Sequence, residues 1–236
     1  DILGHVAQVD QRTGLSEDEL IGIIGEYDGL MIRSGTQVTA AVIAAASRLK
    51  IIGRAGVGVD NVDVPAATQR GVLVVNSPEG NTIAAAEHAL AMMLTLSRHI
   101  PQAHSGMRAG KWDRKKYVGN ELYKKTLGVV GLGKIGSHVA RVAQAMGMEV
   151  IAYDPFIAAD RAQQMQVKLS ELDELFRTAD YVTLHIPRTK DTENLVNAEL
   201  LRTMKPTARI VNCARGGVVD EAAIAEAINN NVIAGA

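Results

Sequence analysis

The residues that most clearly suggest chemistry form a glycine-rich turn in the middle of the chain. A short apolar run, Leu127 to Val130, predicts a buried strand, and Gly131, Gly133 and Gly136 follow it with the spacing G-x-G-x-x-G. An amphipathic segment, 134–146, then predicts a helix. In such a unit the first glycine permits the tight turn, the second admits a pyrophosphate, and the third allows close packing of helix on strand. The helix N-terminus adds N–H donors for phosphates, so the pattern predicts a dinucleotide site.

A carboxylate, Asp154, follows the next predicted strand, where a dinucleotide site requires an acidic residue. Asp154 ends the next predicted strand, Glu149 to Tyr153, near the offset of about 20 residues typical of a side chain that binds ribose hydroxyls. Pro155 and Phe156 follow it, and neither could bind a 2′-phosphate. We therefore expect the cofactor to be NAD rather than NADP.

A second group of residues lies at the end of another predicted strand, Arg209 to Cys213. Arg215 follows this strand and precedes Gly216 and Gly217, which permit a sharp turn beside a cofactor. Ligands of open α/β sheets bind outside the carboxyl ends of strands, and an arginine there can bind a carboxylate through two hydrogen bonds. The alternative is a surface arginine that pairs with an acidic residue of the following segment.

Composition excludes several classes of protein. The chain has 236 residues, 47% of them hydrophobic, which is enough for one large or two small cores. Its net charge of −1 argues against nucleic acid or an anionic membrane as a partner. The single cysteine, Cys213, rules out an internal disulfide framework and fits a cytoplasmic protein. The longest apolar stretch, Ile83 to Ile100, contains charged residues, so no membrane span is expected.

Apolar runs alternate with helical patterns along the chain, which predicts an α/β fold with parallel sheets. The expected strands are 29–33, 51–54, 72–75, 127–130, 149–153, 181–186 and 209–213, with a strand beginning at 232–236. The expected helices are 16–26, 39–48, 82–100, 134–146, 169–179, 198–204 and 221–229. Ser16 with Glu19 forms a capping-box pattern, and Asp220 is a candidate N-cap.

A turn cluster, Ser77-Pro-Glu-Gly80, predicts a domain boundary. We expect residues 1–77 to form a substrate-binding domain and residues 78–236 to form the dinucleotide-binding domain. The predicted helix from Thr82 is apolar on nearly every face, which fits a domain junction or a subunit interface as well as an ordinary core helix.

With these motifs the chain resembles the NAD-dependent D-2-hydroxyacid dehydrogenases. The resemblance covers essentially the whole chain and is greatest to the branch that acts on 3-phosphoglycerate. It rests on the glycine turn and on five further motifs, which are Arg33-Ser-Gly-Thr36, Gly53-Arg-Ala-Gly-Val-Gly-Val-Asp-Asn-Val-Asp63, Asn76-Ser-Pro-Glu-Gly-Asn-Thr82, Trp112-Asp-Arg-Lys-Lys116 and Asn212-Cys-Ala-Arg-Gly-Gly217.

The resemblance implies two Rossmann-like doubly wound domains, a homodimer or homotetramer, and oxidation of 3-phospho-D-glycerate to 3-phosphohydroxypyruvate by hydride transfer to NAD, in serine biosynthesis. It makes Arg215 the catalytic arginine. The implied substrate-binding residues are Arg33, Ser34, Arg54, Ala55, Gly56 and Asn81. The implied cofactor-binding residues are Val57, Gly131, Gly133, Lys134, Ile135, Gly136, Asp154, Ile186, Cys213, Ala214 and Arg215. Arg33, Ser34 and Arg54 suit a phosphate dianion. No metal is implied.

The chain departs from the family pattern in one respect. The family completes its site with a glutamate and a histidine downstream of the arginine, whereas no histidine follows Arg215. His185 could substitute as the base or be a hydrogen-bonded structural residue. The first strand of the small domain is also missing, and a new strand only begins at the last residues. We therefore expect a piece of a longer polypeptide that binds NAD but turns over poorly or not at all when alone.

Two other functions stay open. A glyoxylate or hydroxypyruvate reductase would not need Arg33 and Arg54 together. A non-catalytic NAD-binding fragment or sensor would keep the glycine turn and Asp154 while relaxing the substrate pocket.

Overall fold

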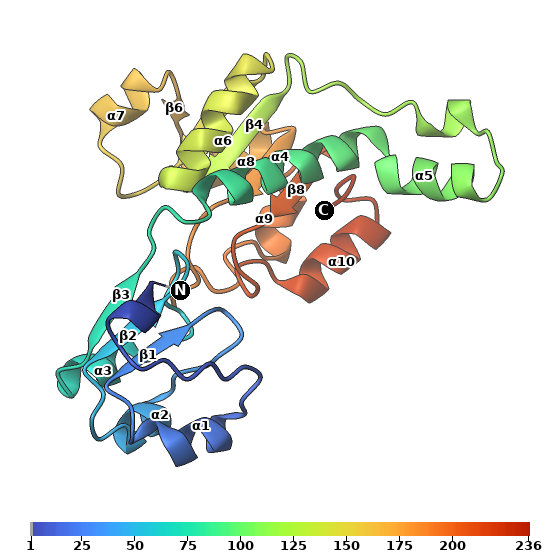
Figure 1. Cartoon of the computed structure of the whole chain (residues 1–236). Helices are drawn as coiled ribbons and strands as arrows, with labels where there is room; N and C mark the ends of the chain where they lie inside the picture. The colour runs from blue at the N-terminus through green and yellow to red at the C-terminus, as the bar shows by residue number, and fades with distance from the viewer. Residues whose placement is uncertain (1) are drawn as a thin grey trace. The chain divides into compact units, whose positions relative to one another are not determined.

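The computed structural model describes residues 2–236 and divides into two compact units, of which the first ends at Asn81 and the second runs from Thr82 to Ala236 (Figure 1). Asp1, with which the expected substrate-binding domain begins, lies outside the described residues. The division falls a few residues after the turn cluster that begins at Ser77. Each unit is described by itself.

The first unit is built on a parallel sheet of three strands. They are β1 (Gly29–Ile32), β2 (Ile51–Arg54) and β3 (Leu73–Asn76), in the order β1-β2-β3. Ile32 lies opposite Arg54, and Arg54 lies opposite Asn76, so the three strands end level with one another. Polar residues that follow these strands are therefore brought to one edge.

Three helices accompany this sheet, namely α1 (Glu17–Ile24), α2 (Ala40–Ala45) and α3 (Val64–Gln69), and a short 3-10 helix, η1 (Leu3–His5), precedes them. Leu20, Ile43 and Ile52 belong to the core that the helices and the sheet share. The predicted capping box of α1 is confirmed, because the Ser16 side chain accepts from Glu19 N–H while the Glu19 carboxylate accepts from Ser16 N–H.

The second unit contains a parallel sheet of five strands. They are β4 (Thr126–Val130), β5 (Glu149–Tyr153), β6 (Lys168–Leu169), β7 (Tyr181–Leu184) and β8 (Arg209–Asn212). Their order is β6-β5-β4-β7-β8, so the chain runs outward from β4 in one direction, returns, and continues in the other. The reversal lies beside β4, and ligands of open α/β sheets bind at such a point.

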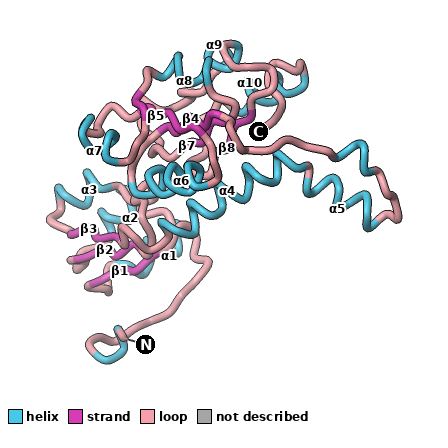
Figure 2. Tube along the Cα trace, turned by 90° about the horizontal axis from the view of Figure 1, so that it is seen from above, coloured by secondary structure: helices cyan, strands magenta, loops and turns pink. Residues whose placement is uncertain are grey.

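Helices cover both faces of this sheet (Figure 2). On one face lie α4 (Thr82–Arg98) and α6 (Lys134–Ala145), which contact each other, and α6 also contacts β4 and β5. On the other face α8 (Leu172–Thr178) contacts β4 and β5, and it is joined by α9 (Ala198–Arg202) and α10 (Glu221–Asn229). Asp220 caps α10 as predicted, because its carboxylate accepts from Ala223 N–H.

The predicted α/β fold with parallel sheets is confirmed, and several boundaries differ from expectation. The expected helix 82–100 ends at Arg98, because His99 adopts a left-handed conformation (φ 52°), and a separate helix, α5 (Ile100–Arg108), follows. The expected helix 169–179 begins only at Leu172, since Lys168–Leu169 pair with β5. The expected strand at 232–236 makes a single bridge, between Gly235 and Arg209.

Four further elements were not expected from the sequence. These are the 3-10 helix η1, α3, α7 (Ala159–Gln164) and the 3-10 helix η2 (Arg114–Tyr117). Together with α5, η2 extends beyond the end of α4, away from the sheet (Figure 1). Across residues 2–236, no helix has both the length and the apolar character needed to cross a membrane.

Candidate active site

The glycine turn follows β4 and leads into α6. Gly131 has a φ of +95°, and a Cβ there would lie 2.8 Å from both the His185 carbonyl oxygen and Ile186 Cγ2. A Cβ on Gly136 would lie only 1.9 Å from the Gly131 carbonyl oxygen, which is closer than any real contact. Both positions therefore require glycine: Gly131 because of its positive φ and the segment after β7, and Gly136 because the start of α6 lies directly against the turn.

Gly133 differs from its two neighbours in the motif. A Cβ at this position would meet nothing within 4 Å, and its φ is −63°. The packing of the protein therefore does not demand glycine here, and the space beside the backbone is open. Gly133 is also the N-cap of α6 and makes no side-chain cap there, so the helix end and the open space lie at the same place. A pyrophosphate fits this combination.

The Asp154 carboxylate joins the end of β5 to the glycine turn. Its Oδ2 accepts from Leu132 N–H at 2.7 Å, and its Oδ1 accepts from Phe156 N–H at 2.9 Å. Each carboxylate oxygen keeps a further lone pair for an outside donor. The structure thus brings Asp154 to the glycine turn, in an orientation that two backbone N–H groups fix.

The segment after β7 lies on the other side of the turn. Ile186 packs against Gly131, as the short distance to a Cβ at position 131 shows. His185 is half-buried, and its Nε2 lies 3.0 Å from Thr183 Oγ1. Burial lowers the pKa of His185 from 6.5 to about 4, so the ring is neutral and a weak base at pH 7. These features favour the structural interpretation of His185 over the catalytic one.

The loop after β8 carries Arg215 and is held by Asn212, to which the sequence analysis gave no role. The Asn212 side chain donates to Arg215 O at 3.0 Å and accepts from Ala214 N–H at 3.1 Å. Arg215 Nη1 donates to Ala214 O at 2.9 Å. Cys213 is partly buried, and this burial raises the pKa of its thiol, so it is protonated at neutral pH.

In the first unit, the candidate substrate residues lie where the strands end. Arg33 and Ser34 follow β1 and are exposed, while Arg54 ends β2 and is half-buried. Ala55 N–H donates to Ile32 O at 2.9 Å, which places Ala55 beside the end of β1. Arg54 Nε is buried and has no hydrogen-bond partner. An unpartnered buried donor of this kind suits an anionic ligand.

A side chain that sequence reasoning missed holds this edge together. The Asn61 Nδ2 donates to Arg33 O at 2.9 Å and to Thr36 O at 2.6 Å. Asn61 is 7% exposed, so it anchors the loop after β1 from inside the unit. Apart from the motif in which Asn61 stands, no local pattern indicates this role, because its partners lie more than 20 residues earlier.

The predicted residues thus form two groups, one in each unit. Arg33, Ser34, Arg54, Ala55 and Gly56 share the strand edge of the first unit. Val57 was predicted to contact the cofactor and Asn81 the substrate, and both belong to this first unit as well. The second unit carries the remaining cofactor residues and Arg215.

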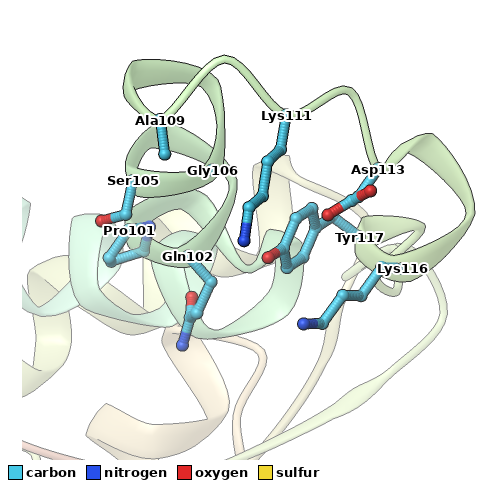
Figure 3. Close-up of a pocket in the computed structure, with 9 residues that line it drawn as sticks. All are labelled: Pro101, Gln102, Ser105, Gly106, Ala109, Lys111, Asp113, Lys116 and Tyr117. Atoms are coloured by element: carbon cyan, nitrogen blue, oxygen red, sulfur yellow. The ribbon is translucent and has the colours of Figure 1, made fainter.

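A shallow hollow of ≈ 480 Å³ lies elsewhere, between α5 and η2 (Figure 3). Lys111, Lys116 and Tyr117 line it, and the Lys116 Nζ lies 5.6 Å from the centre of the Tyr117 ring. None of the predicted site residues contributes to it. Among residues 2–236, no group of three or more His, Cys, Asp or Glu side chains could hold a metal ion.

A family of known proteins matches the part of the chain that carries the glycine turn. Residues 90–236 match the model of the D-isomer-specific 2-hydroxyacid dehydrogenase family, NAD-binding domain. The chain belongs to this family. The match covers most of the second unit, and the predicted family and its NAD cofactor are confirmed.

The chain is also similar to named relatives. It is 65% identical, over all of its length and 43% of the relative's, to D-3-phosphoglycerate dehydrogenase from Synechocystis sp.. It is 49% identical over 98% of its length to the Methanocaldococcus jannaschii protein of the same name, of which it covers 44%. The chain thus spans less than half the length of these curated relatives.

Solved structures share the fold. D-lactate dehydrogenase from Aquifex aeolicus, complexed with NAD and lactic acid, has a TM-score of 0.85 and 30% identity, over 91% of this chain and 65% of that one. The TT0316 protein from Thermus thermophilus has a TM-score of 0.86 and 35% identity, over 94% of this chain and 71% of that one.

The glycine turn yields a paired prediction. Gly136→Ala should lower the free energy of unfolding by about 2 kcal/mol or more, because its methyl group has no room. Gly133→Ala should change stability by less than about 0.5 kcal/mol, yet weaken NAD binding at least about tenfold by filling the open space. Urea unfolding and calorimetric titration with NAD measure both effects. Equal NAD affinity in wild type and Gly133→Ala would contradict the assignment of the open space to the pyrophosphate.

His185 yields a prediction about pH. Its pKa is about 4 in the folded state and 6.5 in the unfolded state, so the unfolded state binds the proton first as pH falls. Stability should therefore fall between pH 6.5 and 4, by about 3 kcal/mol from this group. His185→Gln should remove this part of the pH dependence in urea unfolding, and His104→Gln, at an exposed histidine, should not. An unchanged slope in His185→Gln would contradict the burial argument.

Proposed function

We propose that the protein containing this chain oxidises 3-phospho-D-glycerate to 3-phosphohydroxypyruvate with NAD, the reaction that leads into serine biosynthesis. The observation that carries the proposal is the pair of arginines at adjacent strand ends, Arg33 and Arg54, in a chain 65% identical to a relative named for this activity. Two guanidinium groups with the Ser34 hydroxyl suit a phosphate dianion, since arginine binds phosphate through two parallel hydrogen bonds.

The residues of the second unit take complementary roles in this proposal. Asp154 binds the adenosine ribose, and its negative charge opposes a 2′-phosphate, which favours NAD over NADP. Gly133, Lys134 and Ile135 meet the pyrophosphate at the start of α6. Ile186, Cys213 and Ala214 line the nicotinamide side.

Bound NAD supplies the nicotinamide ring that accepts a hydride from C2 of the substrate. Arg215 orients the substrate carboxylate and the carbonyl that forms, and Asn212 fixes the loop on which Arg215 stands. Asn81 and the backbone at Ala55 and Gly56 complete the substrate site.

The hydroxyl proton needs an acceptor, and we assign this role to no residue among 2–236. His185, the candidate that the sequence offered, is half-buried, and its burial lowers its pKa to about 4. We therefore propose that the base comes from a part of the full protein outside this sequence, in keeping with the greater length of the relatives.

We further propose a homodimer or homotetramer in which α4 and the segment after it form the contact. Leu94, Ile100, Met107 and Trp112 are exposed there, and association would remove their apolar surface from water. A solution mass equal to one subunit would contradict this. Cytoplasmic location remains a prediction that rests on the single cysteine.

A 2-hydroxyacid reductase acting on glyoxylate or hydroxypyruvate is the main alternative. Its substrates carry no phosphate, so it would gain nothing from Arg54. An NAD sensor would bind cofactor without turning over either acid.

Substrate preference tests the proposal in the native full-length protein. We expect NADH formation with 3-phosphoglycerate to exceed that with D-glycerate. Arg54→Ala should lower the ratio of the two kcat/KM values by about 30-fold or more, because a charged phosphate contact is worth about 2 kcal/mol or more. Arg48→Ala removes an exposed arginine of the same unit that pairs with Asp28, and it should leave the ratio unchanged. A ratio that does not respond to Arg54→Ala would favour the reductase.

A further inference from the structure

The Arg54 guanidinium lies directly over Gly56. A Cβ at position 56 would lie 1.5 Å from Arg54 Nη1 and 2.7 Å from Arg54 Cζ. No other glycine for which such contacts are described, among residues 2–236, comes so close to a charged side chain. The absence of a side chain at Gly56 therefore creates the space in which the guanidinium lies.

Three hydrogen bonds hold the backbone at this turn. Gly56 N–H donates to Arg54 O at 2.9 Å, which turns the chain back toward the Arg54 side chain. Ser77 N–H donates to Gly56 O at 3.0 Å, and Asn76 Nδ2 donates to Val57 O at 2.6 Å. These bonds tie residues 56 and 57 to the end of β3. A methyl group added at position 56 would therefore displace the Arg54 guanidinium, which is the end of a flexible side chain.

Hydrogen bonding does not fix the buried part of the Arg54 guanidinium. Its Nε is buried without a hydrogen-bond partner, and such a group loses the free energy of its hydration. The position of the guanidinium thus depends on its packing over Gly56, next to the end of β1 where Arg33 follows. A guanidinium fixed before the ligand arrives binds more tightly than a mobile one, because less conformational entropy is lost on binding.

We propose that Gly56 is the positioning residue for Arg54, and through it determines the preference for a phosphorylated substrate. This inference rests on the proposed function. Gly56 acts through the space it leaves for the guanidinium, in addition to any contact its backbone makes with substrate.

A double-mutant cycle in the native full-length protein tests this. The quantity measured is the ratio of kcat/KM for 3-phosphoglycerate to that for D-glycerate. A general structural defect affects both substrates and cancels in this ratio. Gly56→Ala should lower the ratio about tenfold or more in the wild-type background and less than about twofold in the Arg54→Ala background. Gly22→Ala, at an open position of α1, should leave the ratio unchanged.

The outcomes separate the two claims. A wild-type protein without preference for 3-phosphoglycerate overturns the proposed function. A wild-type preference that Gly56→Ala leaves intact, or lowers equally in both backgrounds, overturns the positioning role alone. Because Gly56 has a φ of +153°, Gly56→Ala strains the turn, so a crystal structure of the wild-type protein provides a second test. It should show the guanidinium over the Gly56 Cα, and a guanidinium directed elsewhere would overturn the inference.

Discussion

The close approach of α6 to the end of β4 is the constraint on which the cofactor site depends. A Cβ at Gly136 would lie 1.9 Å from the Gly131 carbonyl oxygen, so only glycine lets the helix begin this near the strand. The approach fixes the turn, directs the helix N-terminus past Gly133 into open space, and puts Leu132 N–H within reach of Asp154. The end of β4, the start of α6 and the Asp154 carboxylate thus form one site.

The first unit uses the same architecture for a different ligand. Its parallel strands end level with one another, so the residues that follow them share an edge. Amide side chains then fix the loops at this edge: Asn61 holds the loop after β1, and Asn76 holds the turn at Val57. Asn212 does the same for the Arg215 loop of the second unit. Such bonds position the charged groups without taking up their own hydrogen-bonding capacity.

Sequence reasoning found most of the local features and missed the contacts made by folding. The glycine turn and every described strand except β6 were predicted, because apolar runs and glycine spacing are visible within a few residues. Helix α3 was missed although its signals were present, with Asp63 as N-cap and Pro65 in the first turn. Helix α5 has no buried residue, and His99 interrupts an apolar pattern that looked continuous. The role of Asn61 needed coordinates because its partners lie more than 20 residues earlier. The role of Gly56 needed them because its neighbour Arg54, although only two residues away, can adopt several side-chain conformations, and the fold selects the one that lies over Gly56.

The central claim is that NAD binds at the glycine turn and that the Asp154 carboxylate binds its adenosine ribose. Calorimetric titration of the native protein with NAD and with NADP tests this most directly. We predict that NAD binds at least about 100-fold more tightly, because a 2′-phosphate beside a fixed carboxylate costs several kcal/mol. Equal affinity for the two cofactors would contradict the assignment of Asp154.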